Sequence, residues 1–287
     1  MDVFWAVVAA LLVAAVAFPM VRRWRLHRRR RDLITALERR RESRVITMIH
    51  RQEGSGILGF PWGRFISIED SEQVLRAIRL TPPEMPIDVV LHTPGGLVLA
   101  SDQIAYALVR HTGKVTVFVP HYAMSGGTLV ALAADEIVMD ADAVLGPVDP
   151  QLGQPPWGFW PAASILKALD TDNPNRNDQT LILGDMARKA IDQVRDTVAE
   201  LVAPRLGAQA AESLAQTLSE GRWTHDYPIR LEEARQLGLP VRGEVPPEVY
   251  ELMKLYPQRG RRPSVEFVPV PYREPTRPPD RGQSRGR

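Results

Sequence analysis

Short apolar runs alternate with helix-like segments through the middle of this chain, and this alternation most constrains its fold. The runs "RVITMI", "IDVVLH", "VTVFVP" and "EIVM" are four to six residues long, and segments with apolar residues at helical spacing separate them. Strands that are buried on both faces of a sheet consist almost entirely of apolar residues. Parallel strands also need a crossover connection between them, which is usually a helix. The pattern predicts an α/β domain with a parallel sheet and flanking helices. A long amphipathic helix is expected at 178–203, and shorter helices at 208–218 and before Gly238.

The charges are segregated along the chain. Residues 22–44 hold 11 Arg against 3 acidic residues, and residues 259–287 hold 8 Arg against 3. The rest of the chain is left with 17 basic and 28 acidic residues. Because phosphate contacts need basic side chains, an acidic body is not expected to bind nucleic acid. The chain has no cysteine, which excludes a thiol nucleophile and a thiolate metal site.

The N-terminus predicts a membrane anchor. Residues 3–21 carry no charge, and their length is close to the ~20 residues that cross a bilayer core as a helix. The Arg cluster that follows is expected to contact anionic lipid and to keep the body cytoplasmic. The predicted parts are a single-pass transmembrane anchor at 1–21, a basic juxtamembrane helix at 22–44, a body at 45–258 and a largely disordered Pro/Arg-rich tail at 259–287. Lipid contacts are expected through residues 3–31. The alternative reading of 3–21 is a buried core helix.

Two clusters of small residues follow two of the predicted strands. Gly95-Gly96 in "HTPGG" exposes backbone amides, and Ser125-Gly126-Gly127 places a hydroxyl at the start of the next helix. In parallel α/β sheets, chemistry gathers at the carboxyl ends of strands. Two amides that converge from separate loops form an oxyanion hole. The structural alternatives are a tight turn for Pro-Gly-Gly and a helix N-cap for the serine.

Several motifs carry a resemblance to a known family. "HTPGG", "YAMSGGTLVALAADEIVMDADAVLGPVDPQ", "PAASILK" and "GRWTHDYPI" resemble the ClpP/SppA superfamily of serine peptidases, most closely the branch called serine dehydrogenase proteinase. The resemblance covers most of residues 45–245. It implies a ClpP/crotonase-like spiral fold for the body, assembly into a homo-oligomer, Ser125 as nucleophile, and an oxyanion hole from the amides of Gly96 and Gly126.

The general base is left open by this resemblance. Asp149 occupies the place where the Clp proteolytic subunit has its catalytic His, so a Clp-type triad is not intact. Lys167 follows Ser125 by 42 positions, a separation similar to the Ser/Lys dyad of NfeD-type proteases. A catalytic lysine must lose its proton, which apolar neighbours favour. Ser/Lys is the arrangement we expect.

Two further bases are weaker alternatives. Asp226 lies 12 residues before Gly238, where the Clp subunit has its triad Asp, and His225 precedes it directly. This places His225 near the site, although neighbouring residues in an extended segment point opposite ways, and a His/Asp pair is also a common hydrogen-bonding device in loops. Lys189 has the pattern of a solvent-facing residue.

The expected function is a membrane-anchored serine endopeptidase that cleaves membrane-protein or signal-peptide segments. A catalytically inactive membrane scaffold and a crotonase-like acyl-CoA enzyme remain alternatives, although Ser125 argues against the latter. His92, His111 and His121 lack the helical spacing of a metal site, and no Gly-x-Gly-x-x-Gly follows a strand. No metal, cofactor or serine dehydrogenase activity is expected.

Overall fold

The structure is a computed structural model that describes residues 2–50, 65–153 and 158–256. Of the long first helix it describes the backbone, but not the side chains at 3, 6–10, 12–14 and 16. The predicted tail at 259–287 lies outside the described residues.

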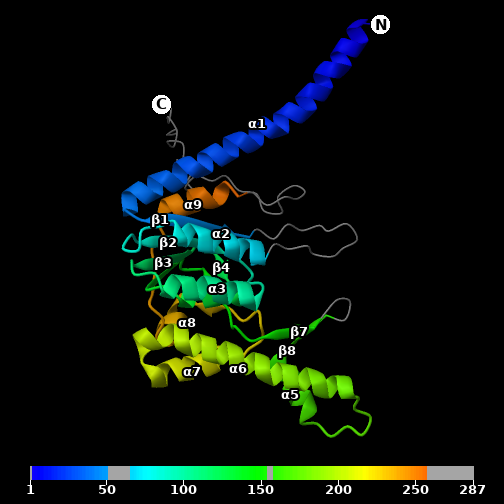
Figure 1. Cartoon of the computed structure of the whole chain (residues 1–287), viewed down its shortest axis with the longest axis vertical. Helices are drawn as coiled ribbons and strands as arrows, with labels where there is room; N and C mark the ends of the chain where they lie inside the picture. Colours follow the sequence, from blue (N-terminus) through cyan, green and yellow to red (C-terminus); the bar gives the residue numbers. More distant parts are fainter. Residues whose placement is uncertain (1, 51–64, 154–157, 257–287) are drawn as a thin grey trace, which may run out of the picture.

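A five-stranded parallel sheet forms the centre of the molecule (Figure 1). Its strand order is β1 (Arg44–Ile49), β2 (Ile87–His92), β3 (Val115–Val119), β5 (Glu136–Met139) and β10 (Val241–Arg242). Each neighbouring pair is parallel. The predicted α/β class and parallel sheet are therefore confirmed, and the first four strands coincide with the four apolar runs.

Side chains of this sheet alternate between two apolar clusters. In β2, Val89 and Leu91 point to the larger cluster, whereas Val90 points to the smaller one. The larger cluster is covered by α2 (Ile68–Arg79), α3 (Val98–Val109), α4 (Gly126–Leu132), α6 (Asp178–Leu206) and α7 (Ala208–Ser219). The smaller is covered by α1 (Asp2–Arg41) and α9 (Pro247–Lys254). Burial on both faces explains why these strands are apolar throughout.

A second, three-stranded sheet lies at the carboxyl side of the first. β6 (Val144–Leu145) pairs parallel with β4 (Tyr122–Ala123) and antiparallel with β9 (Ile229–Arg230). These strands are only two residues long, so they carry no period that sequence reasoning can detect. The short helix α8 (Leu231–Gln236) follows β9 directly.

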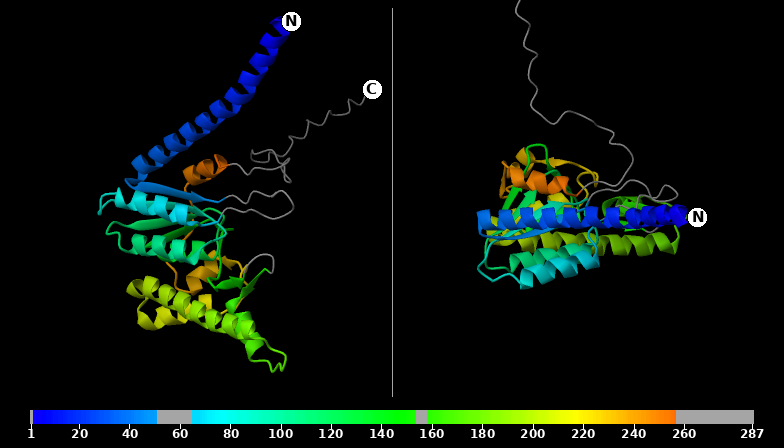
Figure 2. Two further views of the ribbon diagram at one scale, coloured as in Figure 1. Left: turned by 45° about the vertical axis from the view of Figure 1, so that its right-hand side comes forward. Right: turned by 90° about the horizontal axis from the view of Figure 1, so that it is seen from above.

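An arm formed by residues 159–206 extends from this region. The hairpin β7 (Gln151–Gly153) and β8 (Phe159–Pro161) leads into α5 (Ala162–Leu169), which packs on the first half of α6. A small apolar cluster of Ala162, Ile165, Ala187 and Ile191 joins the two helices. Figures 1 and 2 show α6 and α7 together at the end of the molecule opposite α1.

The N-terminal segment is one continuous helix rather than two. α1 runs from Asp2 to Arg41 through Pro19, so the expected boundary between residues 21 and 22 is not a break in secondary structure. Its last turns belong to the body, because Leu37 is only 1% exposed. Within the part of the chain whose side chains are described, no helix has the length and apolarity needed to cross a bilayer. The anchor at residues 3–21 includes side chains outside that part and stays a prediction.

A buried ion pair fixes α1 to the sheet. Arg41 donates to both carboxylate oxygens of Asp88 in β2, and Ser43 Oγ donates to Asp88 Oδ2 at 2.6 Å. Asp88 is 1% exposed, so its charge depends on these donors. The Arg41 guanidinium also lies 4.9 Å from the ring centroid of Phe118.

We expect Asp88→Ala to lower the free energy of unfolding by about 3–5 kcal/mol, because it leaves the guanidinium of Arg41 without its partner in a half-buried position. Urea denaturation in detergent, followed by circular dichroism, measures the change. Glu251→Ala is the matched control: it breaks the exposed pair between Glu251 and Lys254 and should cost at most about 0.5 kcal/mol. Equal losses in the two variants would contradict this account.

Candidate active site

Ser125 has an unusual backbone conformation at the turn between β4 and α4. Its φ is 51° and its ψ is −121°, and its side chain makes no capping hydrogen bond to α4. Non-glycine residues rarely adopt positive φ, and such strain clusters at functional sites, including the strand-to-helix turns that present a catalytic serine. The predicted serine is therefore the N-cap residue by position, but it does not use its hydroxyl as a cap.

The two glycine corners predicted from sequence lie against each other. A Cβ atom added to Gly95, whose φ is +104°, would lie 2.7 Å from Ser125 Cβ and 3.1 Å from the amide nitrogen of Gly126. A Cβ added to Gly126 would lie 2.2 Å from Ser101 Oγ of α3 and 3.5 Å from the amide nitrogen of Gly96. A side chain at Gly95 would separate the two loops, and one at Gly126 would displace Ser101, so both positions require glycine.

The amides of Gly96 and Gly126 are available to a ligand. Among the described residues, no recorded hydrogen bond uses either N–H group or the Ser125 hydroxyl. Gly96 also forms a parallel bridge with Ile66. In this bridge the Ile66 N–H donates to Gly95 O and the Leu97 N–H donates to Ile66 O, which holds the glycine loop in place. The geometry therefore provides a serine hydroxyl beside two free amides from separate loops, which is the donor set of an oxyanion hole.

Thr128 couples this turn to the neighbouring strand. Its buried hydroxyl donates to Ala123 O at 2.8 Å and accepts from Gly146 N–H at 3.0 Å. A Cβ on Gly146 would lie 2.5 Å from Met124 Cε, so the chain that leaves β6 passes directly against the serine turn.

His225 lies next to a carboxylate that sequence reasoning did not pair with it. His225 Nδ1 is 2.8 Å from Asp149 Oδ1, and Gln151 Nε2 donates to Asp149 Oδ2 at 2.7 Å. The side chain of Asp149 is 1% exposed and that of His225 is 33% exposed. The only sequence signal was that Asp149 occupies the place of the Clp histidine.

The other predicted bases lie on exposed surfaces. Lys167 is exposed on α5, which Figure 1 shows at the end of the molecule opposite α1, and no recorded interaction among the described residues joins it to Ser125. Lys189 forms an exposed ion pair with Asp185 at 2.6 Å. Asp226 is exposed. The structure thus brings Ser125, Gly96 and Gly126 together. The hydrogen-bond partner of His225 is Asp149 rather than Asp226.

His50 is a residue near the glycine corner that the sequence analysis missed. Its Nδ1 lies 2.9 Å from Thr93 Oγ1, which in turn accepts from Gly95 N–H at 3.2 Å. The side chain of His50 is 8% exposed and also lies 3.4 Å from Asp70. Its position directly after the first apolar run was the available signal. We interpret it as a support of the Gly95 loop.

The remaining predicted histidines have structural surroundings. The ring of Tyr122 contacts that of His92 in a tilted arrangement and that of His121 edge-on, and His111 Nε2 lies 2.7 Å from Met85 O. In the described ranges, no group of His, Asp and Glu residues has the arrangement of a metal site.

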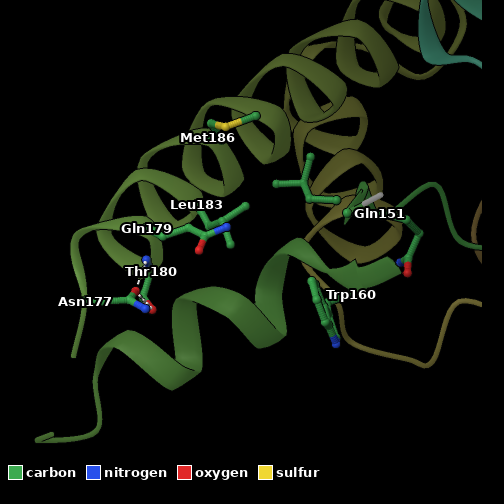
Figure 3. A pocket seen from close by; sticks show the side chains of 9 residues that line it. Gln151, Trp160, Asn177, Gln179, Thr180, Leu183 and Met186 are labelled. Carbon is green, nitrogen blue, oxygen red and sulfur yellow. Dashed lines mark hydrogen bonds between the residues drawn. The ribbon is translucent and has the colours of Figure 1, made fainter. Parts of the chain in front are cut away.

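A groove lies along the arm that carries α5. It has a cavity volume of about 720 Å³ and lies between the β7–β8 hairpin and the first turns of α6. Figure 3 shows Trp160 on one side and Leu183 and Met186 on the other. Gln151, which holds Asp149, is also part of its wall. None of the predicted catalytic residues is among the described residues that line it.

The α/β fold with a parallel sheet and flanking helices is that of a ClpP-like proteinase. The model of the family of ClpP-like SDH-type serine proteinases matches residues 1–280, and this chain belongs to that family. The resemblance inferred from the sequence motifs is therefore confirmed.

This chain is also similar to two sequence relatives and to two solved structures. Two uncharacterized proteins of Methanocaldococcus jannaschii are 53% and 52% identical to this chain over 274 residues, covering 95% of it and 91% and 93% of their own lengths. Two variants of the 1510-N membrane-bound stomatin-specific protease, one in complex with a substrate peptide, are each 20% identical, with TM-scores of 0.45 and 0.44. They cover 66% and 62% of this chain, and 79% and 70% of their own chains are matched.

We expect Gly95→Ala to reduce the reactivity of Ser125 about 10²-fold, because the new methyl group displaces the serine turn and the Gly126 amide. The rate at which a fluorophosphonate probe modifies Ser125 measures the effect. Gly243→Ala is the control, since its Cβ would make only an ordinary contact of 3.8 Å with Leu231. A Gly95→Ala protein that reacts at the wild-type rate would show that the close approach is not needed.

Proposed function

We propose that this protein is a serine endopeptidase in which Ser125 is the nucleophile and the amides of Gly96 and Gly126 form the oxyanion hole. The observation that carries the proposal is the strained Ser125 backbone beside two amides that have no recorded partner among the described residues. A structural N-cap serine would use its hydroxyl on the helix and would need no positive φ. Membership of a family of serine proteinases supports the same conclusion.

The reaction is acyl transfer in two steps. Ser125 Oγ attacks the scissile carbonyl carbon and loses its proton to a base, while the carbonyl oxygen becomes an oxyanion held by the two amides. Each such donor contributes roughly 3 kcal/mol of transition-state stabilisation. The amine leaves with a proton, and water then releases the acyl group. Lys167 and His225 are the two candidate bases for the first step.

The substrate we propose is an extended, apolar peptide segment. The residues that follow the Gly96 corner are exposed and apolar: Leu97 is 47%, Val98 52% and Leu99 61% exposed. The groove lined by Trp160, Leu183 and Met186 offers a second apolar surface. Membrane-protein or signal-peptide segments have side chains of this kind. Assembly into a homo-oligomer is part of the proposal, and membership of the ClpP-like family supports it.

The N-terminal helix is proposed to anchor the protein in a membrane, with its body in the cytoplasm. Its described large apolar side chains in the first half are 46–72% exposed, namely those of Phe4, Trp5, Leu11, Phe18, Met20 and Val21. Their burial in the body is therefore not what stabilises this part of α1. The Arg-rich segment that follows favours the cytoplasmic side and contacts with anionic lipid.

Covalent labelling tests the proposed nucleophile. A fluorophosphonate should modify the wild-type protein at Ser125, the label should be absent from Ser125→Ala, and casein cleavage should be lost in the same variant. Thr128→Ser keeps the hydroxyl that bridges the turn and serves as a folded control. An inactive scaffold or an acyl-CoA enzyme without a nucleophile would leave the wild type unlabelled.

Membrane extraction tests the anchor. We expect the full chain to stay in the membrane pellet after carbonate and high-salt washes, and a variant that lacks residues 1–21 to move to the supernatant, because it loses the uncharged run. Proteolysis should cut the body in inside-out vesicles and not in right-side-out vesicles. A full-length protein released by carbonate alone would remove the anchor from the proposal.

A further inference from the structure

The peptide groups on either side of Gly95 are each held by a hydrogen bond. The Gly95 N–H donates to Thr93 Oγ1 at 3.2 Å, and the Gly95 carbonyl accepts from the Ile66 N–H at 2.7 Å. The Gly95 carbonyl and the Gly96 N–H belong to one planar peptide group and point in opposite directions. The bond to Ile66 therefore turns the Gly96 N–H away from Ile66. Together the two bonds set the direction of one proposed oxyanion donor.

Thr93 joins this glycine loop to the serine turn. Its N–H donates to Tyr122 O at 3.2 Å and its carbonyl accepts from the Met124 N–H at 3.0 Å, so its backbone is tied to the segment that leads to Ser125. A Cβ added to Gly127 would lie 2.5 Å from Thr93 Cγ2, so the threonine methyl group packs directly on the start of α4. The side chain of Thr93 is completely buried. One residue thus contacts both loops that supply the proposed donors.

His50 decides which way the Thr93 hydroxyl points. Its Nδ1 lies 2.9 Å from Thr93 Oγ1, and its Nε2 lies 3.4 Å from Asp70 Oδ2. A carboxylate beside Nε2 favours the tautomer with the proton on that nitrogen, which leaves Nδ1 as an acceptor in the neutral ring. The Thr93 hydroxyl then donates to His50, and a lone pair of its oxygen accepts the Gly95 N–H. The competing acceptor, Gly95 O, is more distant at 3.3 Å and is already bonded to Ile66.

These contacts close into a ring. Asp70 Oδ2 accepts from the N–H of Ser67 at 2.9 Å and from its Oγ at 3.0 Å at the start of α2, and Ser67 directly follows Ile66. The backbone of His50 is fixed as well, since its N–H donates to His92 O at 2.7 Å beyond the β1–β2 ladder. The ring runs through Ile66, Gly95, Thr93, His50, Asp70 and Ser67. The side chain of His50 is only 8% exposed, so bulk water does not take its place.

We propose that His50 is a positioning residue of the oxyanion hole, which acts through Thr93 on the loop of Gly95 and Gly96. The proposal rests on the function proposed above and adds a residue that does not itself touch the substrate. Without an acceptor at the place of Nδ1, the Thr93 hydroxyl turns to Gly95 O and competes there with the Ile66 N–H. Two adjacent glycines then let the peptide group that carries the Gly96 N–H rotate. The transition state loses a preorganised donor, while Ser125 keeps its place.

Two substitutions of His50 test this role without a known peptide substrate. His50→Leu offers no acceptor, and the limiting rate constant for fluorophosphonate modification of Ser125 should fall about 10²-fold, the lower end of what the loss of one oxyanion donor costs. His50→Asn offers Oδ1 near the place of Nδ1 and should restore most of the rate. The probe concentration that gives half the limiting rate should be the same in all three proteins, because the donor acts in the transition state.

His111→Leu is the matched control. It makes the same change at a histidine whose ring contacts Met85 O near the start of β2, at the opposite ends of the strands from Ser125. This variant should be modified at the wild-type rate.

Substitutions of Thr93 test the route of the effect. Thr93→Val replaces the hydroxyl by a methyl group and should lower the limiting rate at least as far as His50→Leu does, because the Gly95 N–H also loses its acceptor. Thr93→Ser keeps the hydroxyl and should react faster than Thr93→Val. The double variant of His50→Leu and Thr93→Val should lose no more than Thr93→Val alone, because residues that act in one network are not additive. Losses that multiply would show that His50 acts by another route.

Glycine amide resonances report the donor itself. In protein labelled with ¹⁵N-glycine, the N–H protons of Gly96 and Gly126 should move downfield when Ser125 is modified, because each then donates to the phosphoryl oxygen. In His50→Leu, the Gly126 proton should still move, whereas the Gly96 proton should move less. A role limited to stability would lower the unfolding temperature and leave both shifts as in the wild type.

The possible failures are distinct. A wild-type protein that is never labelled overturns the proposed function itself. A labelled wild type whose limiting rate is unchanged in His50→Leu overturns only the role of His50. An equal loss in His50→Leu and His50→Asn, with both glycine shifts intact, also overturns that role and assigns the histidine to the stability of the fold.

Discussion

The pairing of β4, β6 and β9 is the constraint on which the candidate active site depends. Ala123, Leu145 and Ile229 form one row across this small sheet. Ser125, Asp149 and His225 each lie within a few residues of that row, although they are up to 100 positions apart in the chain. Thr128 ties the row together with two buried hydrogen bonds. Because a single hydroxyl bridges the β4 turn and the β6 exit, a shift of either strand disturbs the nucleophile and the His225–Asp149 pair at once.

Two glycines are as important for the candidate site as any of its side chains. Gly95 and Gly126 let two loops approach until the serine turn, the Gly96 amide and the Gly126 amide share one small volume. Ser125, which follows Met124 in the same turn, has a positive φ, and the surrounding packing holds it there. The strained serine and the Gly96 and Gly126 amides, which have no recorded partner among the described residues, therefore lie in one turn-to-turn contact.

The sequence predicted the strands and helices that show hydrophobic periodicity. It did not predict the features that depend on contacts between distant segments of the chain. The runs that became β1, β2, β3 and β5 were recognisable because both faces of those strands are buried. The two-residue strands β6 and β9 carry no such pattern, and the hairpin of β7 and β8 contains Gly and Pro. The bond between Asp149 and His225 spans 76 positions and follows only from that pairing. Lys167 was selected by its separation from Ser125, but distance along a chain does not give the direction of a side chain, which here is outward from α5.

The hydrogen bond between Asp149 and His225 depends on strand pairing rather than on sequence order. The antiparallel return of β9 brings its entry to the edge where β6 ends, so two residues that are 76 positions apart in the chain meet there. The two partners differ in burial, because the side chain of Asp149 is 1% exposed and that of His225 is 33% exposed. The carboxylate is therefore enclosed by its hydrogen-bond partners His225 and Gln151, whereas the imidazole presents one edge to solvent.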